Sequence, residues 1–303
     1  MGLSPRQGYF DRVLIDLNTQ CDFLLPRGAV PVANREEILP NVRRLMSWAR
    51  NARLPVISTI DSHRPGEPSN GFPPYCVDRT PGQKKLPFTL LPRRLVLHGD
   101  NTLDLPIEAF RRYRQLIFTK RAGDFLTNPK ADRLVSQVRV HHMIVFGVIT
   151  ECCVKAAVLS LMARLRRVVV VKDACGYWSP PDADLAMRQM EAKGAILVTT
   201  DELITGQAEE IIRAISVAAS AGKASENDQS AEPVGGNRIA VSQDHKGHNG
   251  KGRDGKHDVL PARADSSAAA DRLARPPNQT DDSSTGHLIP RPTVSARRRS
   301  PRR

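Results

Sequence analysis

The sequence predicts a three-layer α/β/α sandwich with a mostly parallel sheet, followed by a disordered C-terminal tail. From residue 12 to about residue 217, short apolar β-branched runs alternate with longer helical patterns. Strands that are apolar on both faces must be covered by helices on both sides, which is the arrangement of parallel sheets with helical crossovers. A change of composition beyond this alternating region predicts the tail.

The globular domain is expected to span residues 9–217 and the tail residues 218–303. Every aromatic residue lies at or before Trp178, and residues 221–303 are rich in Ser, Gly, Pro, Asp and Arg. Such a composition cannot bury enough apolar surface to offset the chain entropy lost on folding. One domain of about 200 residues, within the usual size range, therefore holds all of the chemistry.

The first elements alternate as strand and helix. Residues 12–17 form an apolar strand, and Asn34 with Glu37 three residues later has the spacing of a capping box that opens an amphipathic helix. The next strand, 54–60, precedes a Pro/Gly-rich segment over residues 63–92. Because this segment is too long for an ordinary connection, we expect it to be either disordered or functional.

The second half of the domain repeats this alternation. Short β-branched runs predict strands, and apolar residues at helical spacing predict helices. The expected strands span residues 94–98, 115–119, 142–147, 167–172 and 195–199. The expected helices span residues 128–138, 152–164, 182–193 and 201–217. Ligands of such sheets bind at the carboxyl ends of the strands, so the informative side chains are expected there.

The net charge of +13 does not by itself indicate a nucleic-acid partner. Residues 221–303 contain 15 Lys+Arg and 10 Asp+Glu, and their densest basic piece is residues 297–303. This piece lacks the aromatic residues on which bases stack, so we expect at most weak electrostatic contacts by the tail. No apolar run reaches the roughly 18 residues of a membrane span, and no apolar signal core is present, which disfavours membrane and secreted proteins.

The five cysteines are odd in number and have neither C-x-x-C nor zinc-finger spacing, so we expect reduced thiols in a cytoplasmic protein. Cys152 and Cys153 lie where a strand ends and a helix begins. A thiol in the first turn of a helix is favoured as thiolate, and backbone N–H groups there can hold an oxyanion. The alternative is that such a cysteine is a small buried apolar residue.

Two charged residues extend this candidate set. Lys120 directly follows the strand 115–119, where it is either a surface residue with a buried stem or the cationic partner of a thiol. Asp16 lies within the first apolar strand, and a buried carboxylate is costly unless it is paired. A Cys, an Asp and a Lys on three strand ends are coherent as a nucleophile, its proton acceptor and its cationic partner.

A set of motifs occurs in a fixed order along the domain. They are Gln20-Cys-Asp-Phe23, Ser58-Thr-Ile-Asp-Ser-His63, Phe72-Pro-Pro-Tyr-Cys-Val77 with Thr80-Pro-Gly82, Lys120 with Asp124-Phe125, and Gly147–Val154 followed by Val170-Val-Lys-Asp-Ala174. The motifs and their order resemble those of the isochorismatase-like cysteine hydrolases, which include nicotinamidases, pyrazinamidases and N-carbamoyl amide hydrolases. The resemblance covers about Asp11 to Ile204. The resemblance implies their α/β fold and their chemistry.

The resemblance also implies roles for particular residues. The family's nucleophile is the Cys before Val, which here is Cys153 and not Cys152. The family's cis peptide would lie between Val148 and Ile149. Its oxyanion hole would use the backbone N–H groups of Ile149 and Cys153.

The chain departs from the family pattern after the first strand. The pattern Asp-x-Gln-x-Asp-Phe places Asn18 where the catalytic Asp belongs, and an Asn cannot accept a thiol proton. Asp16 lies two residues earlier on the same strand face, about 6.6 to 6.8 Å away, so a small shift or bulge would let it act. We expect Asp16 to be the base. The alternative leaves Asn18 in the catalytic position and makes the protein a weakened or inactive relative.

A second departure concerns a metal ion. The nicotinamidase-like members bind a divalent ion through Asp-x-His and a further His in Phe-Pro-Pro-His-Cys-Val. This chain has Asp61 and His63 but Tyr75 at the third position, and a neutral phenol is a poor ligand. Two interpretations stay open: Asp61 and His63 hold zinc or a similar ion, or they are polar residues of a pocket wall.

Taken together, these features predict a cysteine hydrolase that cleaves a C–N bond in a small amide or carbamoyl compound through a thioester at Cys153. We expect Asp16 to accept the thiol proton, Lys120 to hold the charged pair, and the chain to form a homo-oligomer. The alternative is a non-catalytic binding or scaffold protein that has kept the fold. Asn18 and Tyr75 favour that alternative. The set of Cys153, Lys120 and Asp16 favours the enzyme.

Overall fold

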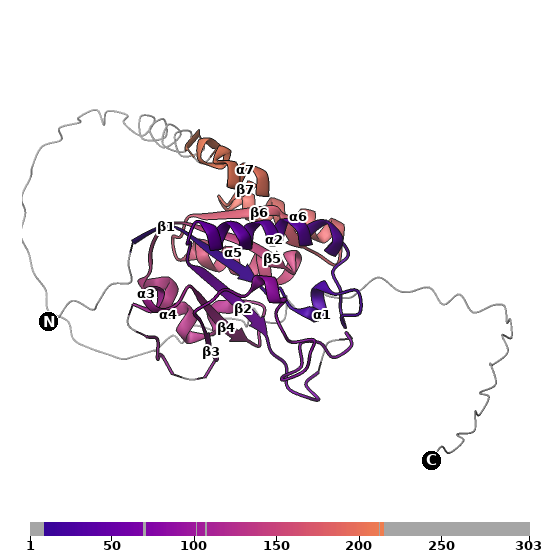
Figure 1. Ribbon diagram of the computed structural model, residues 1–303. Helices are drawn as coiled ribbons and strands as arrows, with labels where there is room; N and C mark the ends of the chain where they lie inside the picture. The colour runs from indigo at the N-terminus through magenta and orange to yellow at the C-terminus, as the bar shows by residue number, and fades with distance from the viewer. Residues whose placement is uncertain (1–8, 69–70, 101, 107, 212, 215–303) are drawn as a thin grey trace, which may run out of the picture.

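Seven parallel strands form one sheet at the centre of the molecule. The computed structural model describes residues 9–214 except 69, 70, 101, 107 and 212. Within this part, the strand order is β3-β4-β2-β1-β5-β6-β7. The strands lie side by side from β3 at one edge to β7 at the other (Figure 1). The tail predicted for residues 218–303 lies outside the described residues.

The strands agree with the predicted alternation, although several begin earlier or end later than expected. They are β1 (Tyr9–Leu17), β2 (Val56–Asp61), β3 (Arg94–Leu97), β4 (Gln115–Lys120), β5 (Arg139–Val148), β6 (Val168–Gly176) and β7 (Ile196–Val198). All neighbouring strands pair in parallel. The prediction of a parallel sheet is therefore confirmed.

Helices connect the strands. They are α1 (Cys21–Leu24), α2 (Arg35–Asn51), α3 (Ala109–Arg112), α4 (Pro129–Gln137), α5 (Lys155–Ala163), α6 (Pro180–Ala192) and α7 (Thr200–Thr205). Shorter turns are η1 (Pro87–Thr89), η2 (Phe125–Thr127) and the π-helical η3 (Thr150–Val154). None of the helices in the described residues is long and apolar enough to cross a membrane.

Alternate residues of β1 reach two different hydrophobic cores, because successive side chains of a strand point to opposite faces. Leu14 belongs to the core that contains most of the buried residues of α2. Ile15 belongs to the core that contains buried residues of α4, α5 and α6. The sheet is thus covered by helices on both faces, which confirms the three-layer sandwich.

The predicted capping box at the start of α2 is wrong. The side chain of Asn34 makes no capping hydrogen bond. Instead, its amide nitrogen donates to the backbone oxygen of Cys175 at 3.1 Å, and its amide oxygen accepts from the backbone nitrogen of Tyr177 at 3.1 Å. The side chain therefore ties the start of α2 to the end of β6 because the two segments lie in contact.

The last predicted helix, residues 201–217, is also wrong as one continuous element. α7 ends at Thr205, and Gly206 follows with a φ of 89°. This left-handed conformation is typical of a glycine that ends a helix. Residues 207–211 are helical again, and residues 215–217 lie outside the described part.

The Pro/Gly-rich segment over residues 63–92 is ordered where the structure describes it. Backbone hydrogen bonds tie it to the turn after β1: Cys21 N donates to Lys84 O at 2.8 Å, and Leu86 N donates to Thr19 O at 2.9 Å. The segment is therefore held against the carboxyl end of the sheet.

A buried ion pair fastens the same segment to β1. Lys85 Nζ lies 2.9 Å from Asp16 Oδ2, and the two side chains are 1% and 0% exposed. The hydroxyls of Thr19 and Ser58 donate to the carboxylate at 2.8 and 2.9 Å. Lys85 Nζ also donates to Thr19 Oγ1 and Thr59 O. Burial lowers the pKa of Lys85, and Asp16 opposes that decrease. Both charges thus find partners inside the protein, as buried charges require.

Removing one charge of this pair is expected to lower the free energy of unfolding more than removing both charges. Lys85→Met should lower the free energy of unfolding by about 3–5 kcal/mol, because Asp16 would stay buried without its partner. Asp16→Leu/Lys85→Met should lose less, because no unpaired charge remains. Denaturant unfolding of the natural chain and both variants at neutral pH measures the three values. A double variant less stable than Lys85→Met would contradict the expectation.

Candidate active site

Four of the polar side chains follow strands that are neighbours in the sheet. Asn18 follows β1, Asp61 ends β2, Lys120 ends β4, and Cys153 lies in η3 directly after β5. Strand β2 lies on one side of β1 and β5 on the other, so the chain order reverses here. The carboxyl ends of strands at such a switch point are where ligands of open α/β sheets bind.

The backbone that leads from β5 to Cys153 has a special conformation. Gly147 has a φ of 120°, and a Cβ atom at this position would lie 2.1 Å from Leu17 O. Only glycine fits this close approach of β5 to β1. The peptide between Val148 and Ile149 is cis, which confirms what the resemblance implied. η3 follows, with Cys153 as its fourth residue.

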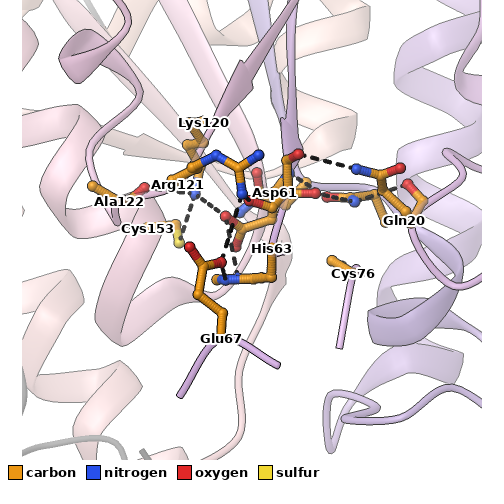
Figure 2. A network of polar contacts seen from close by, with 12 residues as sticks. Gln20, Asp61, His63, Glu67, Cys76, Lys120, Arg121, Ala122 and Cys153 are labelled. Atoms are coloured by element: carbon orange, nitrogen blue, oxygen red, sulfur yellow. Dashed lines mark hydrogen bonds and ion pairs between the residues drawn. The ribbon is translucent and has the colours of Figure 1, made fainter. Parts of the chain in front are cut away.

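The ammonium group of Lys120 connects a carboxylate with a thiol. Lys120 Nζ lies 3.1 Å from Asp61 Oδ1, 3.0 Å from Ala122 O and 3.5 Å from Cys153 Sγ (Figure 2). The Lys120 side chain is 0% exposed. Burial alone would lower the pKa of Lys120, but Asp61 and Cys153 raise it above its usual value. The side chain therefore carries a buried positive charge next to the sulfur.

The two neighbouring thiols differ in acidity. Their sulfurs lie 4.0 Å apart. The hydrogen bond with Cys152 is the largest cause that lowers the pKa of Cys153 to about 7, and Lys120 lowers it further against the opposing effects of burial and Asp61. The same hydrogen bond and the charge of Cys153 raise the pKa of Cys152 well above its usual value. Of the two thiols, Cys153 therefore ionises first.

The carboxylate beside Lys120 is Asp61, whereas the sequence analysis expected Asp16. Asp16 belongs to the buried pair with Lys85, and Lys120 makes its ion pair with Asp61. The reason lies in the sheet order: β2 and β4 are neighbours, and Asp61 is directly paired with Lys120 in their register. From the sequence, Asp61 is expected only as a metal ligand or as a residue of a pocket wall. The position of Asp61 at the end of the second strand was the feature of the sequence that could have indicated a role next to Lys120.

Asn18 occupies the end of β1 with a neutral amide. The side-chain oxygen of Asn18 accepts a hydrogen bond from Thr59 Oγ1 at 2.5 Å. The backbone nitrogen of Asn18 donates to Thr59 Oγ1 at 3.0 Å. Its side-chain nitrogen is buried and has no hydrogen-bond partner among the described residues. Position 18 thus supplies no proton acceptor to the site.

The residues around Asp61 do not fit a divalent metal ion. Asp61 Oδ1 is in the ion pair with Lys120 and lies 3.9 Å from His63 Nε2. Tyr75 packs against His63 with 4.7 Å between ring centres, and burial with the charge of Asp61 raises the pKa of its phenol. The described residues contain no group of three or more His, Cys, Asp or Glu that could hold a metal. The geometry therefore supports the second interpretation, a polar pocket wall.

Two further residues hold the site in place. Gln20 forms a reciprocal pair with the backbone of Asp61, donating to its oxygen at 2.9 Å and accepting from its nitrogen at 2.7 Å (Figure 2). Glu151 Oε1 accepts from the backbone nitrogens of Trp178 and Ser179 at 2.9 and 3.0 Å. Gln20 is part of a recognised motif, but no pattern in the sequence indicated the role of Glu151.

Aromatic rings form a cluster next to the thiols. Phe23 lies 5.5 Å from Tyr75 and 6.3 Å from Trp178 between ring centres, and Phe72 stacks on Trp178 at 4.7 Å. Cys152 packs against the same apolar cluster. The site thus has a charged side, formed by Lys120 and Asp61, and an apolar aromatic side.

Known proteins resemble this chain in sequence or in fold. The nicotinamidase of Escherichia coli (strain K12) is 27% identical over 207 residues, which cover 62% of this chain and 94% of that protein. The structure of a putative isochorismatase hydrolase from Oleispira antarctica has a TM-score of 0.51 at 14% identity and covers 68% of this chain and 99% of that chain. The pyrazinamidase/nicotinamidase of Streptococcus mutans UA159 has a TM-score of 0.50 at 18% identity, with 62% and 99% covered.

A family model assigns the chain more directly. The model of the isochorismatase domain matches residues 12–202, a continuous stretch from β1 into α7. The stretch is more than half of the sequence and contains every residue of the site described above. The chain therefore belongs to the isochorismatase domain family.

Proposed function

We propose that this isochorismatase-family hydrolase cleaves the C–N bond of a small amide or carbamoyl compound, with Cys153 as the nucleophile. The observation that carries the proposal is the contact of the buried Lys120 ammonium with Cys153 Sγ at 3.5 Å. The family and the nicotinamidase relative support an amide as the substrate. The predicted thioester at Cys153 is kept in this proposal.

The reaction would begin with the thiolate of Cys153. A pKa of about 7 leaves a large fraction of the thiol ionised at neutral pH, and Lys120 stabilises the negative sulfur. In this proposal Asp61, which is paired with Lys120, takes the role first expected of Asp16 and accepts the thiol proton. The sulfur then attacks the amide carbon, and the electron pair of the C=O bond moves to oxygen.

The backbone N–H groups of Ile149 and Cys153 are proposed to hold this oxyanion. When the C–N bond breaks, Asp61 returns the proton to the leaving amine, and a thioester remains on Cys153. Water then attacks the thioester after giving a proton to Asp61, and the acid leaves as the thiolate forms again. The sum of both steps is amide plus water to acid plus amine, so no metal is required by this scheme.

The aromatic side of the site favours a flat or apolar group on the substrate. Phe23 belongs to the buried apolar cluster against which both Trp178 and Cys152 pack. Aromatic rings bind flat groups through stacking and edge contacts. A substrate with its amide at Cys153 and its body against these rings would meet both sides of the site.

The first test of the proposal is the identity of the reactive thiol. Iodoacetamide at neutral pH should modify Cys153 before the other four cysteines, because thiolates react and thiols do not. The labelling rate should rise with pH through about 7, where Cys153 loses its proton. Lys120→Met should slow labelling at neutral pH by about fivefold or more, because a rise of one pKa unit from about 7 lowers the thiolate fraction by that factor. Peptide mass mapping identifies the site, and first labelling at Cys152 would contradict the proposal.

Matched variants of the two thiols connect this reactivity with turnover. Cys153→Ser should abolish release of amine from a panel of small amides, because a neutral hydroxyl is a far weaker nucleophile than a thiolate. Cys152→Ser should keep measurable activity, because a serine hydroxyl at position 152 can donate a hydrogen bond to the ionised sulfur of Cys153, whose pKa the hydrogen bond with Cys152 lowers. Loss of activity in Cys152→Ser alone would assign the nucleophile to the other thiol.

A weakened enzyme or a binding protein is the second candidate, and Asn18 favours it. In the resemblance this position carries the catalytic carboxylate, but here it carries an amide whose nitrogen has no partner among the described residues. If the proton acceptor is truly missing, a carboxylate placed at position 18 would restore it.

Two substitutions separate these candidates. If Asp61 is the proton acceptor, Asp61→Asn should lower kcat by about 10²- to 10⁴-fold, the range typical of general acid–base groups. In the same case Asn18→Asp should change the activity by less than about tenfold. Melting curves show whether each variant is folded. A gain of about 10²-fold or more in Asn18→Asp would instead assign the natural chain to the weakened class.

A further inference from the structure

A cavity on the far side of Lys120 from the thiols shares this residue with the candidate active site. Its volume is about 720 Å³, and residues 120–122 form part of its lining. The other walls come from the carboxyl ends of β2, β3 and β4 and from the segment 78–84. Neither Cys153 nor the aromatic cluster is among the lining residues. The cavity is therefore bounded by Lys120 but not by either of the two thiols.

The lining of this cavity carries more positive than negative charge. It contains Arg79, Lys84 and Arg121, and Asp78 is the one carboxylate among the described lining residues. Arg121 Nη2 donates to Asp78 Oδ2 at 2.9 Å, so these two charges balance. Neither Arg79 nor Lys84 forms an ion pair within the described part of the chain. Two cations thus remain without a counter-charge.

Hydrogen bonds fix the turn that carries these cations. The backbone nitrogen of Arg79 donates to Gln83 Oε1 at 2.8 Å, and Gln83 Nε2 donates to Asp78 Oδ1 at 2.8 Å. The backbone nitrogen of Asp78 donates to His63 O at 2.8 Å. The turn is therefore ordered without a ligand, so binding need not order it.

We propose that this cavity binds the phosphate group of a small molecule. Arg79 and Lys84 supply two uncompensated positive charges, which match the charge of about −1.5 to −2 on a phosphate monoester at neutral pH. Arginine and lysine are also the side chains that hydrogen-bond phosphate most strongly. The volume lies within the range of small-molecule sites, and the place at the carboxyl edge of the sheet is where such ligands bind.

The phosphate would lie close to residues 120–122, which include Lys120, without contacting the thiol of Cys153. Ala122 lines the cavity, and its backbone oxygen accepts the hydrogen bond from Lys120. Arg121 also lines the cavity, and its guanidinium donates to Ser62 O next to Asp61 at 2.9 Å. The inference rests on this geometry and charge alone, so it holds whether or not Cys153 is a nucleophile.

Calorimetric titration of the full chain with inorganic pyrophosphate tests the inference. We expect saturable binding at low ionic strength and a loss of affinity of at least tenfold in Arg79→Gln/Lys84→Gln. The matched control Arg188→Gln/Lys193→Gln removes the same charges from two exposed positions, one within α6 and one directly after it. It should keep the natural affinity. The basic residues 297–303 are present in every variant, so non-specific binding by the tail contributes equally.

Three results would overturn the inference. They are no saturable binding of pyrophosphate by the natural chain, unchanged affinity in Arg79→Gln/Lys84→Gln, and an equal loss in the control variant. The last result would show that the total charge of the chain attracts the anion, because both double variants remove two positive charges. Melting curves of the two variants confirm that each is folded.

Discussion

The buried ammonium of Lys120 is the interaction on which the rest of the site depends. A charge without solvent is costly in a protein interior unless opposite charges and hydrogen-bond acceptors surround it. Asp61, the backbone oxygen of Ala122 and Cys153 provide these partners. The register of β2 with β4 brings Asp61 to Lys120, and Gln20 fixes the backbone of Asp61. The sheet therefore places one positive charge where a thiolate can form.

Two Lys–Asp pairs are buried in the described part of the chain, and their other partners distinguish them. Lys85 pairs with Asp16, and its remaining contacts are a hydroxyl and a carbonyl, so every partner is unreactive. Lys120 pairs with Asp61, and one of its remaining contacts is the sulfur of Cys153. The first pair fastens the segment over residues 63–92 to β1. The second pair, with a nucleophile in contact, is suited to chemistry.

Local patterns predicted the fold because the spacing of the apolar residues indicates whether a segment forms a strand or a helix. The strand ends near Asn18, Lys120 and Cys153 could be read in this way. Asp61 could not be assigned to Lys120, because sequence does not give the order of strands in the sheet. Asn34 is the N-cap residue of α2 as expected, but its side chain forms no capping box for a similar reason: its partners, Cys175 and Tyr177, are distant in sequence. The boundary at residue 217, the cytoplasmic location and the homo-oligomer stay predictions.

The central claim is that Lys120 lowers and Asp61 raises the pKa of Cys153, in addition to the larger effect of the hydrogen bond with Cys152. A pH titration of thiolate ultraviolet absorbance, taken as the difference from Cys153→Ser, measures this acidity directly. The account predicts a midpoint of about 7 in the natural chain, a higher midpoint in Lys120→Met and a lower one in Asp61→Asn. A natural midpoint near the ordinary cysteine value of 9.0, unchanged in both variants, would contradict it.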